Sequence, residues 1–452
     1  MNFWSLVGEF SFIVLYLFFL FFSLSSLKEK KNRAFTRSTI LLLVLLVTNF
    51  IFLLLEEPLR SWMFGGVFIL FILAVSLLLF IPVPKKSIQI IGEQRKIDER
   101  DVIFARFDYK EGTEIFDTYY RRRQEYKEID KKIRKIPDIL SSSHSKKSPL
   151  LFTLASAEFD FLEDQITRVD GKKSAERIEL SPLASTHIIK KFIHYLGSDC
   201  CGIAPLNQAY VYSHVGRGGE EPYGTEINLK HEYAIVFAVE MDFEMVSTAP
   251  QAPVIVETGK KYIEAARISI IVADFIRRLG YSARAHIAGS NYQALLPPIA
   301  WEAGLGELGR LGTLITWKYG ARARLGLVTT ELPLVVERPK KYGIQNFCQN
   351  CQKCVRNCPA QAIPSGEKTE ENGVLKWVLN REECYKFWRK AGTDCAVCMF
   401  VCPYSKPDTL FHSFIRRFTA HSNVFQYLSI WGDDFFYGRS PSRRTKSPVG
   451  IL

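Results

Sequence analysis

The residues best able to do chemistry are eight of the ten cysteines, gathered in one stretch toward the C-terminal end. They follow the spacing C-x2-C-x2-C-x3-C-P from Cys348 to Pro359 and C-x2-C-x3-C-P from Cys395 to Pro403, with Cys384 between the two runs. Thiolates at such spacings converge on a shared centre, and the prolines turn the chain away afterwards. The pattern indicates electron transfer through iron–sulfur clusters.

The first run is the bacterial ferredoxin pattern, in which the fourth cysteine serves the other of two clusters. We therefore expect two [4Fe–4S] clusters with crossed ligands. The first is assigned Cys348, Cys351, Cys354 and Cys402, and the second Cys358, Cys384, Cys395 and Cys398. A structural zinc site or disulfides are the alternatives, because tetrahedral sulfur sites also suit zinc. Two interleaved sets of four at this spacing favour the clusters.

The chain begins with three apolar segments, which we expect to anchor the cysteine-containing part of the protein. They cover residues 3–27, 38–55 and 62–81, and each is about long enough to cross a hydrocarbon core of roughly 30 Å as a helix. No basic region precedes the first segment and no small-residue cleavage site follows it, so we do not expect a cleaved signal peptide. We expect a membrane domain with three transmembrane helices over residues 1–84.

The loops between these segments predict the orientation. The first loop carries Lys28, Lys30, Lys31, Arg33 and Arg37, whereas the second carries Glu56, Glu57 and only Arg60. The positive-inside rule therefore places the N-terminus outside and everything after residue 81 in the cytoplasm. We expect a multi-pass protein of the inner (cytoplasmic) membrane whose catalytic domain faces the cytoplasm. The formal net charge of +12 is spread along the chain, which fits a surface beside a lipid bilayer better than a nucleic-acid partner.

The rest of the chain divides by composition. Residues 85–149 are dense in charge and end in a Ser-rich stretch, so we expect a juxtamembrane connector and linker. Residues 150–340 alternate between helical and strand-like stretches, which predicts an α/β domain. Residues 341–412 form the ferredoxin-like domain and residues 413–452 a C-terminal tail. Within the α/β domain we expect helices at 186–196 and 257–279 and strands at 233–240, 282–287 and 324–330.

Several motifs in this region resemble the reductive dehalogenase family. The longest is AGLGELGRLGTLIT at 303–316, and GIAPL at 202–206, EMDFEM at 240–245 and GTDC at 392–395 accompany it. The resemblance covers about residues 150–412 and extends, more distantly, to epoxyqueuosine reductase. That relative usually shows Gly-Trp-x-Gly-Lys where this chain has Gly306-Glu307-Leu308-Gly309-Arg310, a departure that favours the dehalogenase.

The resemblance implies a base-off cobalamin in the α/β domain, with the dicluster ferredoxin domain packed against it and no protein histidine on the cobalt. It implies reductive removal of halide from an organohalide, R–X + 2e⁻ + H⁺ → R–H + X⁻. The electrons would come from a low-potential donor, namely reduced ferredoxin, flavodoxin or a membrane carrier. Respiratory members are usually exported by a twin-arginine signal and held by a separate anchor protein. Three spans built into this chain depart from that plan and leave the donor open.

Such a reaction needs a proton donor, and a Tyr phenol is suitable if a nearby cation stabilises the phenolate. Tyr262 is our first choice, with Tyr292 in reserve, although either could be an ordinary core ring. Arg310 and Arg324 are equal candidates for the cation, and Asn291 is a candidate polar contact. Gly304, Gly306, Gly309 and Gly312 predict close approach of the backbone to a corrinoid, unless they serve only sheet geometry.

A different class of function stays open on the sequence alone. A membrane-anchored dicluster electron-transfer protein would use the α/β region merely to dock a partner. An epoxyqueuosine-reductase-like corrinoid reductase is the other alternative. The roughly 190-residue domain before the cysteines exceeds what a ferredoxin-type carrier requires, and this favours the enzyme.

Overall fold

The computed structural model describes residues 3–80, 86–145, 148–217, 222–289 and 292–443. They fall into two compact units. The first, here called the membrane unit, joins Met1–Lys85 to Thr409–Ser442. The second, here called the core unit, comprises Lys86–Asp408 with Arg443–Leu452. Each unit is described by itself.

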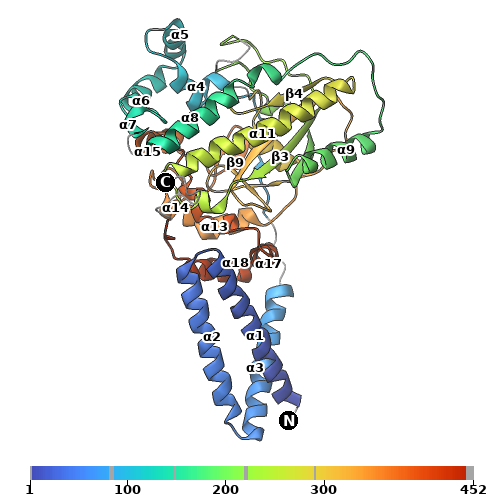
Figure 1. Ribbon diagram of the computed structural model, residues 1–452, viewed down its shortest axis with the longest axis vertical. Coiled ribbons are helices and arrows are strands. Elements are labelled where there is room, and N and C mark those ends of the chain that lie inside the picture. Colours follow the sequence, from blue (N-terminus) through green and yellow to red (C-terminus); the bar gives the residue numbers. More distant parts are fainter. Residues whose placement is uncertain (1–2, 81–85, 146–147, 218–221, 290–291, 444–452) are drawn as a thin grey trace. The chain divides into compact units, whose positions relative to one another are not determined.

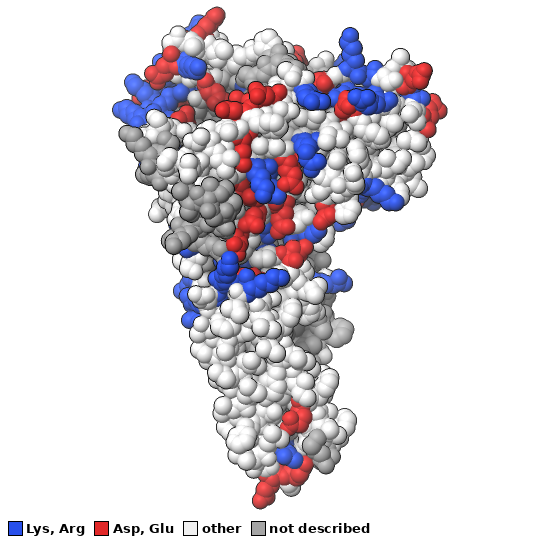
Figure 2. Space-filling model, in the orientation of Figure 1, with Lys and Arg blue, Asp and Glu red and all other residues white. Residues whose placement is uncertain are grey.

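The membrane unit is built on three long helices, α1 (Phe3–Lys28), α2 (Asn32–Leu53) and α3 (Glu57–Phe80). All three are long and apolar enough to cross a membrane by length and composition. In the space-filling view, the surface over these helices is broad and almost free of charged side chains (Figure 2). The three predicted apolar helices are therefore confirmed, and their outward apolar side chains suit lipid as the surrounding solvent.

Small and hydroxylated residues bring these helices together. A Cβ on Gly8 of α1 would lie 2.2 Å from the ring of Phe64 on α3, so only glycine permits this contact. The Ser23 hydroxyl on α1 lies 2.7 Å from that of Ser38 and 3.0 Å from that of Thr39, both on α2. Close backbone approach and hydroxyl hydrogen bonds are what hold helices together in lipid.

Two further helices, α17 (Leu410–Thr419) and α18 (Asn423–Phe436), complete the membrane unit. They lie across the end of α1 and α2 at which the basic loop joins these two helices (Figure 1). Phe22 of α1 is buried beside Phe411 and Phe436, with ring centroids 4.6 and 4.7 Å away. Residues 413–452 were expected to be a tail. Up to residue 442 they instead fold back on the membrane helices, because their aromatic rings bury against those helices.

The core unit contains a four-stranded sheet in the order β2-β3-β7-β4. Its strands are β2 (Cys200–Pro205), β3 (Tyr233–Glu240), β7 (Ala323–Thr330) and β4 (Ala283–His286), and every pairing is antiparallel. Strands β3, β4 and β7 follow the predicted ranges closely, whereas β2 was not predicted. The antiparallel order was not predicted, because β3 is apolar throughout, as a strand buried on both faces is in either kind of sheet.

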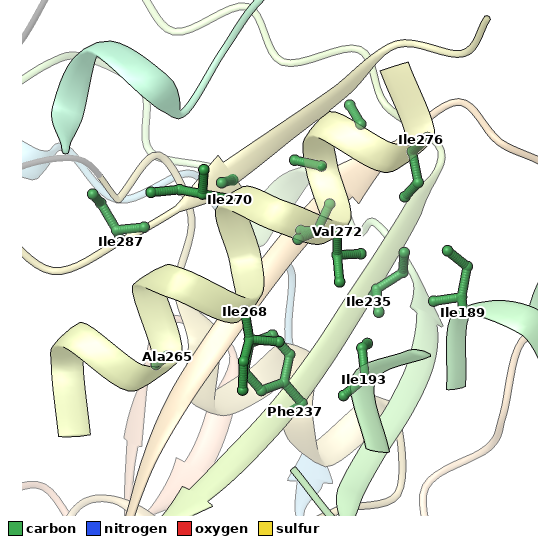
Figure 3. Packing of buried hydrophobic residues seen from close by; sticks show 14 of the residues in the cluster. Ile189, Ile193, Ile235, Phe237, Ala265, Ile268, Ile270, Val272, Ile276 and Ile287 are labelled. Atoms are coloured by element: carbon green, nitrogen blue, oxygen red, sulfur yellow. The ribbon is translucent and has the colours of Figure 1, made fainter. Parts of the chain in front are cut away.

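Both faces of this sheet are covered. Ile235, Phe237 and Val239 of β3 face α9 (Pro182–Tyr195) and α11 (Pro253–Arg278), which lie on one side (Figure 3). The alternate residues face α12 (Leu296–Glu302) and the segment before β3. Layers of helix and sheet are present as predicted, and the long α11 runs along the sheet.

Residues 86–145 form part of the core unit rather than a connector. They contain β1 (Gln89–Ile90), α4 (Ile103–Asp108), α5 (Glu114–Arg122), α6 (Gln124–Arg134) and α7 (Ser142–Ser145), and α8 (Pro149–Glu163) follows. The buried Arg106 bonds Asp130 at 2.6 Å and Glu382 at 3.0 Å. Some of the charged residues in this segment therefore form ion pairs inside the protein. Composition alone had suggested that they face solvent.

The cysteine-rich part consists of short helices and one small sheet. The helices are α13 (Ile344–Cys351), α14 (Lys353–Asn357), α15 (Arg381–Ala391) and α16 (Val397–Val401). Strands β8 (Thr369–Glu371) and β9 (Val374–Lys376) pair with β1 in the order β1-β9-β8. The remaining elements are the hairpin β5 (Gly306–Leu308) and β6 (Leu314–Thr316), helix α10 (Phe243–Val246), and 3-10 turns at Glu99–Asp101, Ile166–Arg168, Gln208–Tyr210 and Pro403–Ser405.

Candidate iron–sulfur ligands and active site

The first predicted cysteine set is assembled from three helices. Cys348 and Cys351 lie on α13, Cys354 on α14, and Cys402 directly follows α16. Gln352, in the left-handed conformation with φ 48°, separates α13 from α14 and turns the thiols toward one another. Cys348 and Cys354 both interact electrostatically with Cys402. Burial, reinforced by Cys402, raises the pKa of Cys354 to about 12.

The second set repeats this geometry. Ala396 has φ 51° and opens α16 directly after Cys395, just as Gln352 opens α14 after Cys351. Cys398 on α16 interacts electrostatically with Cys395, Cys384 and Cys358 of this set and also with Cys354 of the first set, so the two sets adjoin here. Burial raises the pKa of Cys384 to about 11 and that of Cys395 to about 12.

These two groups have the chemistry that iron–sulfur clusters require. A buried thiol with a raised pKa is neutral at physiological pH and becomes a good ligand only when a metal displaces its proton. Each group draws its thiols from segments far apart in the sequence, so binding a cluster would also tie those segments together. Within the described residues, no group of three or more His, Cys, Asp or Glu is placed to hold a single metal ion.

A tyrosine–arginine pair lies beside the second cysteine group. The guanidinium carbon of Arg324, on β7, lies 4.9 Å from the ring centre of Tyr262, on α11. Arg324 Nη2 donates to Thr258 Oγ1 at 2.6 Å and to Asp394 Oδ2 at 2.7 Å. The Thr258 hydroxyl in turn donates to Asp394 Oδ2 at 2.5 Å. The structure thus brings together the two predicted residues Tyr262 and Arg324.

The sequence explains why these groups meet. Thr258 and Tyr262 are four residues apart on α11 and so share one face of the helix. Asp394 immediately precedes Cys395, and the α16 that follows packs its Val397 and Phe400 against the start of α11. This packing brings the carboxylate of Asp394 into contact with the guanidinium of Arg324 on β7.

The electrostatics favour a charged arginine. Burial would by itself lower the pKa of Arg324, but the neighbouring Tyr262 and Asp394 reverse this effect and raise it. The Nε of Arg324 is buried without a hydrogen-bond partner among the described residues. Burial, and then the nearby Tyr262, raise the pKa of the reserve residue Tyr292. Asn291 lies outside the described residues.

Arg310, the other predicted cation, lies elsewhere. Its Nε donates to Cys348 O at 3.0 Å, and its Nη1 donates to Pro364 O at 2.8 Å and Gly366 O at 2.9 Å. Its guanidinium also stacks over Trp377 at 4.5 Å. All of these groups belong to the cysteine-rich part, so Arg310 fastens the first cysteine loop instead of standing beside Tyr262. The structure thus places Arg324, and not Arg310, beside Tyr262, while a catalytic role for either arginine stays a prediction.

The glycines of the same motif have protein neighbours. A Cβ on Gly306 would lie 2.1 Å from Ile315 O, and one on Gly309 would lie 2.4 Å from the Ile315 side chain. Gly304 and Gly312 have φ values of 73° and 82°, which favour glycine in turns. The β5–β6 hairpin thus accounts for Gly306, Gly309 and Gly312, and the turn after α12 accounts for Gly304, in agreement with the alternative that these glycines serve only local backbone geometry. Contact of Gly304, Gly306, Gly309 and Gly312 with a corrinoid stays a prediction.

Sequence reasoning did not single out Thr258, Asp394 or Trp377. Asp394 carried a signal, because it lies within the GTDC motif that contributes to the family resemblance. Thr258 and Trp377 carried none, since their roles depend on contacts between distant segments: Thr258 bonds a residue 136 positions away.

Comparison with known proteins finds a matching family model and two kinds of similar enzyme. A family model described as a 4Fe-4S dicluster domain matches residues 347–406. The tetrachloroethene reductive dehalogenase of Dehalobacter restrictus is 34% identical over 303 residues, which cover 57% of this chain and 54% of the relative. An epoxyqueuosine reductase of Lactococcus garvieae is 30% identical over 133 residues, covering 26% of this chain and 37% of the relative.

Solved structures agree. A reductive dehalogenase structure reported to suggest a mechanism for B12-dependent dehalogenation matches with a TM-score of 0.63 at 25% identity, covering 79% of this chain and 49% of that one. A catabolic reductive dehalogenase in complex with 3-bromo-4-hydroxybenzoic acid matches with a TM-score of 0.62 at 26% identity and with the same coverage. The chain spans about half the length of the relatives it matches. The predicted resemblance to reductive dehalogenases, with a weaker one to epoxyqueuosine reductase, is confirmed.

Proposed function

We propose that this chain is a membrane-anchored, cobalamin-dependent reductive dehalogenase, which removes halide from an organohalide with two electrons and one proton. The observation that carries the proposal is the Tyr262–Arg324 pair, held by Asp394 directly beside the cluster ligand Cys395. A proton donor and an electron-carrying loop then meet at one place. The similarity to reductive dehalogenases over more than half of the chain supports the same function.

In this reaction the carbon–halogen bond breaks, the halide leaves with the bonding pair, and the carbon receives two electrons and a proton. Bound cobalamin would supply low-potential cobalt for the bond cleavage. Tyr262 gives its phenolic proton to the carbon, and Arg324 stabilises the phenolate left behind. Asp394 and Thr258 keep the guanidinium in place, because each shares Nη2 of Arg324.

The described residues fit a bound cobalamin and substrate on two counts. Tyr262 and Tyr292 are only partly buried, so their rings border space that a ligand can occupy. The partnerless Nε of Arg324 is a buried donor that an acceptor on substrate, halide or cofactor would satisfy. Likeness to a structure linked to B12-dependent dehalogenation supports cobalamin as the cofactor.

The cysteine groups supply the electrons in this proposal. Cys348, Cys351, Cys354 and Cys402 hold one [4Fe–4S] cluster, and Cys358, Cys384, Cys395 and Cys398 hold the other. The electrostatic proximity of Cys402 to Cys348 and Cys354 supports the crossed assignment. The interaction of Cys398 with Cys395, Cys384 and Cys358 supports the second set, and its interaction with Cys354 indicates that the two sets adjoin. The second cluster is then nearest to Arg324, which makes it the last step of the relay.

The membrane unit anchors the enzyme. Five basic residues in and beside the α1–α2 loop, from Lys28 at the end of α1 to Arg37 on α2, support a cytoplasmic catalytic unit, with a low-potential ferredoxin, flavodoxin or membrane carrier as the donor. A C-terminal reporter that is active only after export should be silent, and a cytoplasmic fluorescent fusion should be bright. The opposite pattern would place the core unit outside and exclude cytoplasmic donors.

The deciding experiment is anaerobic purification with added cobalamin, followed by assays with a chemical reductant. Corrinoid absorption bands and about eight irons per chain are expected, with halide release from at least one of a panel of chlorinated alkenes and brominated phenols. Tetrachloroethene and 3-bromo-4-hydroxybenzoic acid belong in that panel, because proteins similar to this chain act on or bind them. Intact clusters without corrinoid binding would instead identify a membrane-anchored electron-transfer protein.

A further inference from the structure

The two C-terminal helices of the membrane unit each expose large apolar side chains, here together called the outer stripe. On α18 these side chains recur at i, i+3, i+4 and i+7, which places them on one helical face. Trp431 is 63% exposed and Leu410 83% exposed. The outer stripe consists of Leu410, Phe414, Val424, Tyr427, Leu428 and Trp431.

The opposite faces of the same helices already have partners inside the membrane unit. Phe411 and Phe436 pack on Phe22 of α1. His412 Nε2 lies 3.0 Å from Glu29 Oε1, and both side chains are buried. The outer stripe is therefore not the surface that attaches the helices to the protein. A helix pair in water would carry polar residues there, so an apolar outer face indicates a second, apolar environment.

The position of the stripe identifies that environment. The helices lie across the ends of α1 and α2 (Figure 1), whose outward side chains are themselves apolar and exposed. Arg37, near the start of α2, donates to Phe435 O at 2.5 Å and stacks over the Phe435 ring at 4.4 Å. The outer stripe thus lies on helices that pack against the basic end of the transmembrane helices.

The composition matches the membrane interface. Trp and Tyr prefer the headgroup level, where an apolar ring and a polar edge are both satisfied. Trp431 and Tyr427 lie in the stripe, and the exposed Arg417 and Lys28 are in the same unit. We infer that α17 and α18 form an interfacial hairpin, which embeds the outer stripe among acyl chains and sets its basic residues against anionic phospholipid headgroups.

The test uses the full chain, reconstituted in phosphatidylethanolamine–phosphatidylglycerol vesicles that contain brominated lipids, which quench tryptophan on contact. The membrane unit contains Trp4, Trp62 and Trp431. The Trp431→Phe variant should lose about a third of the lipid-quenchable emission, because one of three rings at the membrane is removed. Trp317→Phe is the matched control: Trp317 is 47% exposed but belongs to the core unit, so its removal should not change the quenchable emission.

Bromines near the headgroups should quench Trp431 more than bromines deep in the chains. Arg417→Gln should shift the Trp431 emission to longer wavelength in phosphatidylglycerol vesicles but not in uncharged ones. Equal quenchable emission in the Trp431→Phe variant and the wild type would overturn the inference. So would chemical crosslinks between outer stripes of two copies, because the stripe would then be covered by protein. Quenching of Trp4 and Trp62 reports insertion independently of dehalogenase activity.

Discussion

Removing the charge of Arg324 tests the proposed proton transfer most directly. Two unit charges at the 4.9 Å between its guanidinium and the Tyr262 ring interact by about 3 kcal/mol at an effective dielectric of about 20. The phenolate forms only as the proton leaves, so this energy acts on the transition state. Arg324→Met should therefore slow turnover by about 10²-fold, measured as halide release by the cobalamin-loaded enzyme.

The same substitution has a structural effect that must be separated from catalysis. It leaves Asp394 buried without the cation that it bonds at 2.7 Å, and breaking a buried ion pair in this way costs about 3–5 kcal/mol. In the double variant Arg324→Met/Asp394→Asn no uncompensated charge remains, so most of that stability should return. Turnover should stay low, because the cation is still missing.

Thermal unfolding, iron content and corrinoid absorption would be measured on all three proteins. A single variant that binds both cofactors fully and keeps wild-type turnover would refute the role of Arg324 at Tyr262. Recovery of turnover together with stability in the double variant would show that Arg324 serves the fold alone.

Three further predictions follow from contacts elsewhere in the core unit. Tyr262→Phe should lower turnover by about 10²–10⁴-fold with cofactors intact, whereas Tyr292→Phe should not; the reverse result would move the proton donor to Tyr292. Cys354→Ala should lose one cluster and about four of eight irons by iron and sulfide analysis, and stoichiometric zinc without sulfide would contradict this. Burial, with Glu257 second, raises the pKa of Glu158 from 4.5 to about 7. The unfolded chain therefore ionises first, and stability falls as pH rises from 4.5 to about 7. Glu158→Gln should then raise the free energy of unfolding more at pH 8 than at pH 5.5, by about 1–2 kcal/mol after solvent screening. An equal effect at both pH values would exclude this origin.

The sequence pattern correctly predicted individual helices and strands, because each of these depends on residues close together in the chain. The apolar run at 233–240 predicted strand β3, and the helical periodicity at 257–279 predicted helix α11. A buried strand or helix face requires apolar residues at regular positions, so it can be recognised in the sequence. The antiparallel pairing left no such trace, since it depends on which strands meet. Arg310 and Arg324 were indistinguishable for the same reason: one meets loops more than 50 residues away and the other meets Asp394 across 70 residues.

The membrane unit is assembled from both ends of the sequence, and this imposes an order on biosynthesis. Helices α1 to α3 leave the ribosome first, and α17 and α18 emerge only after Lys86–Asp408 of the core unit have been translated. At about 5–20 residues per second, translating the roughly 320 intervening residues takes on the order of 15–65 s. Throughout that interval Phe22 and Glu29 lack the partners that Phe411 and His412 later provide. The bundle is thus closed only when the core unit is fully made, and a chain released early, with its core incomplete, would expose an uncovered aromatic surface that quality-control proteases can recognise.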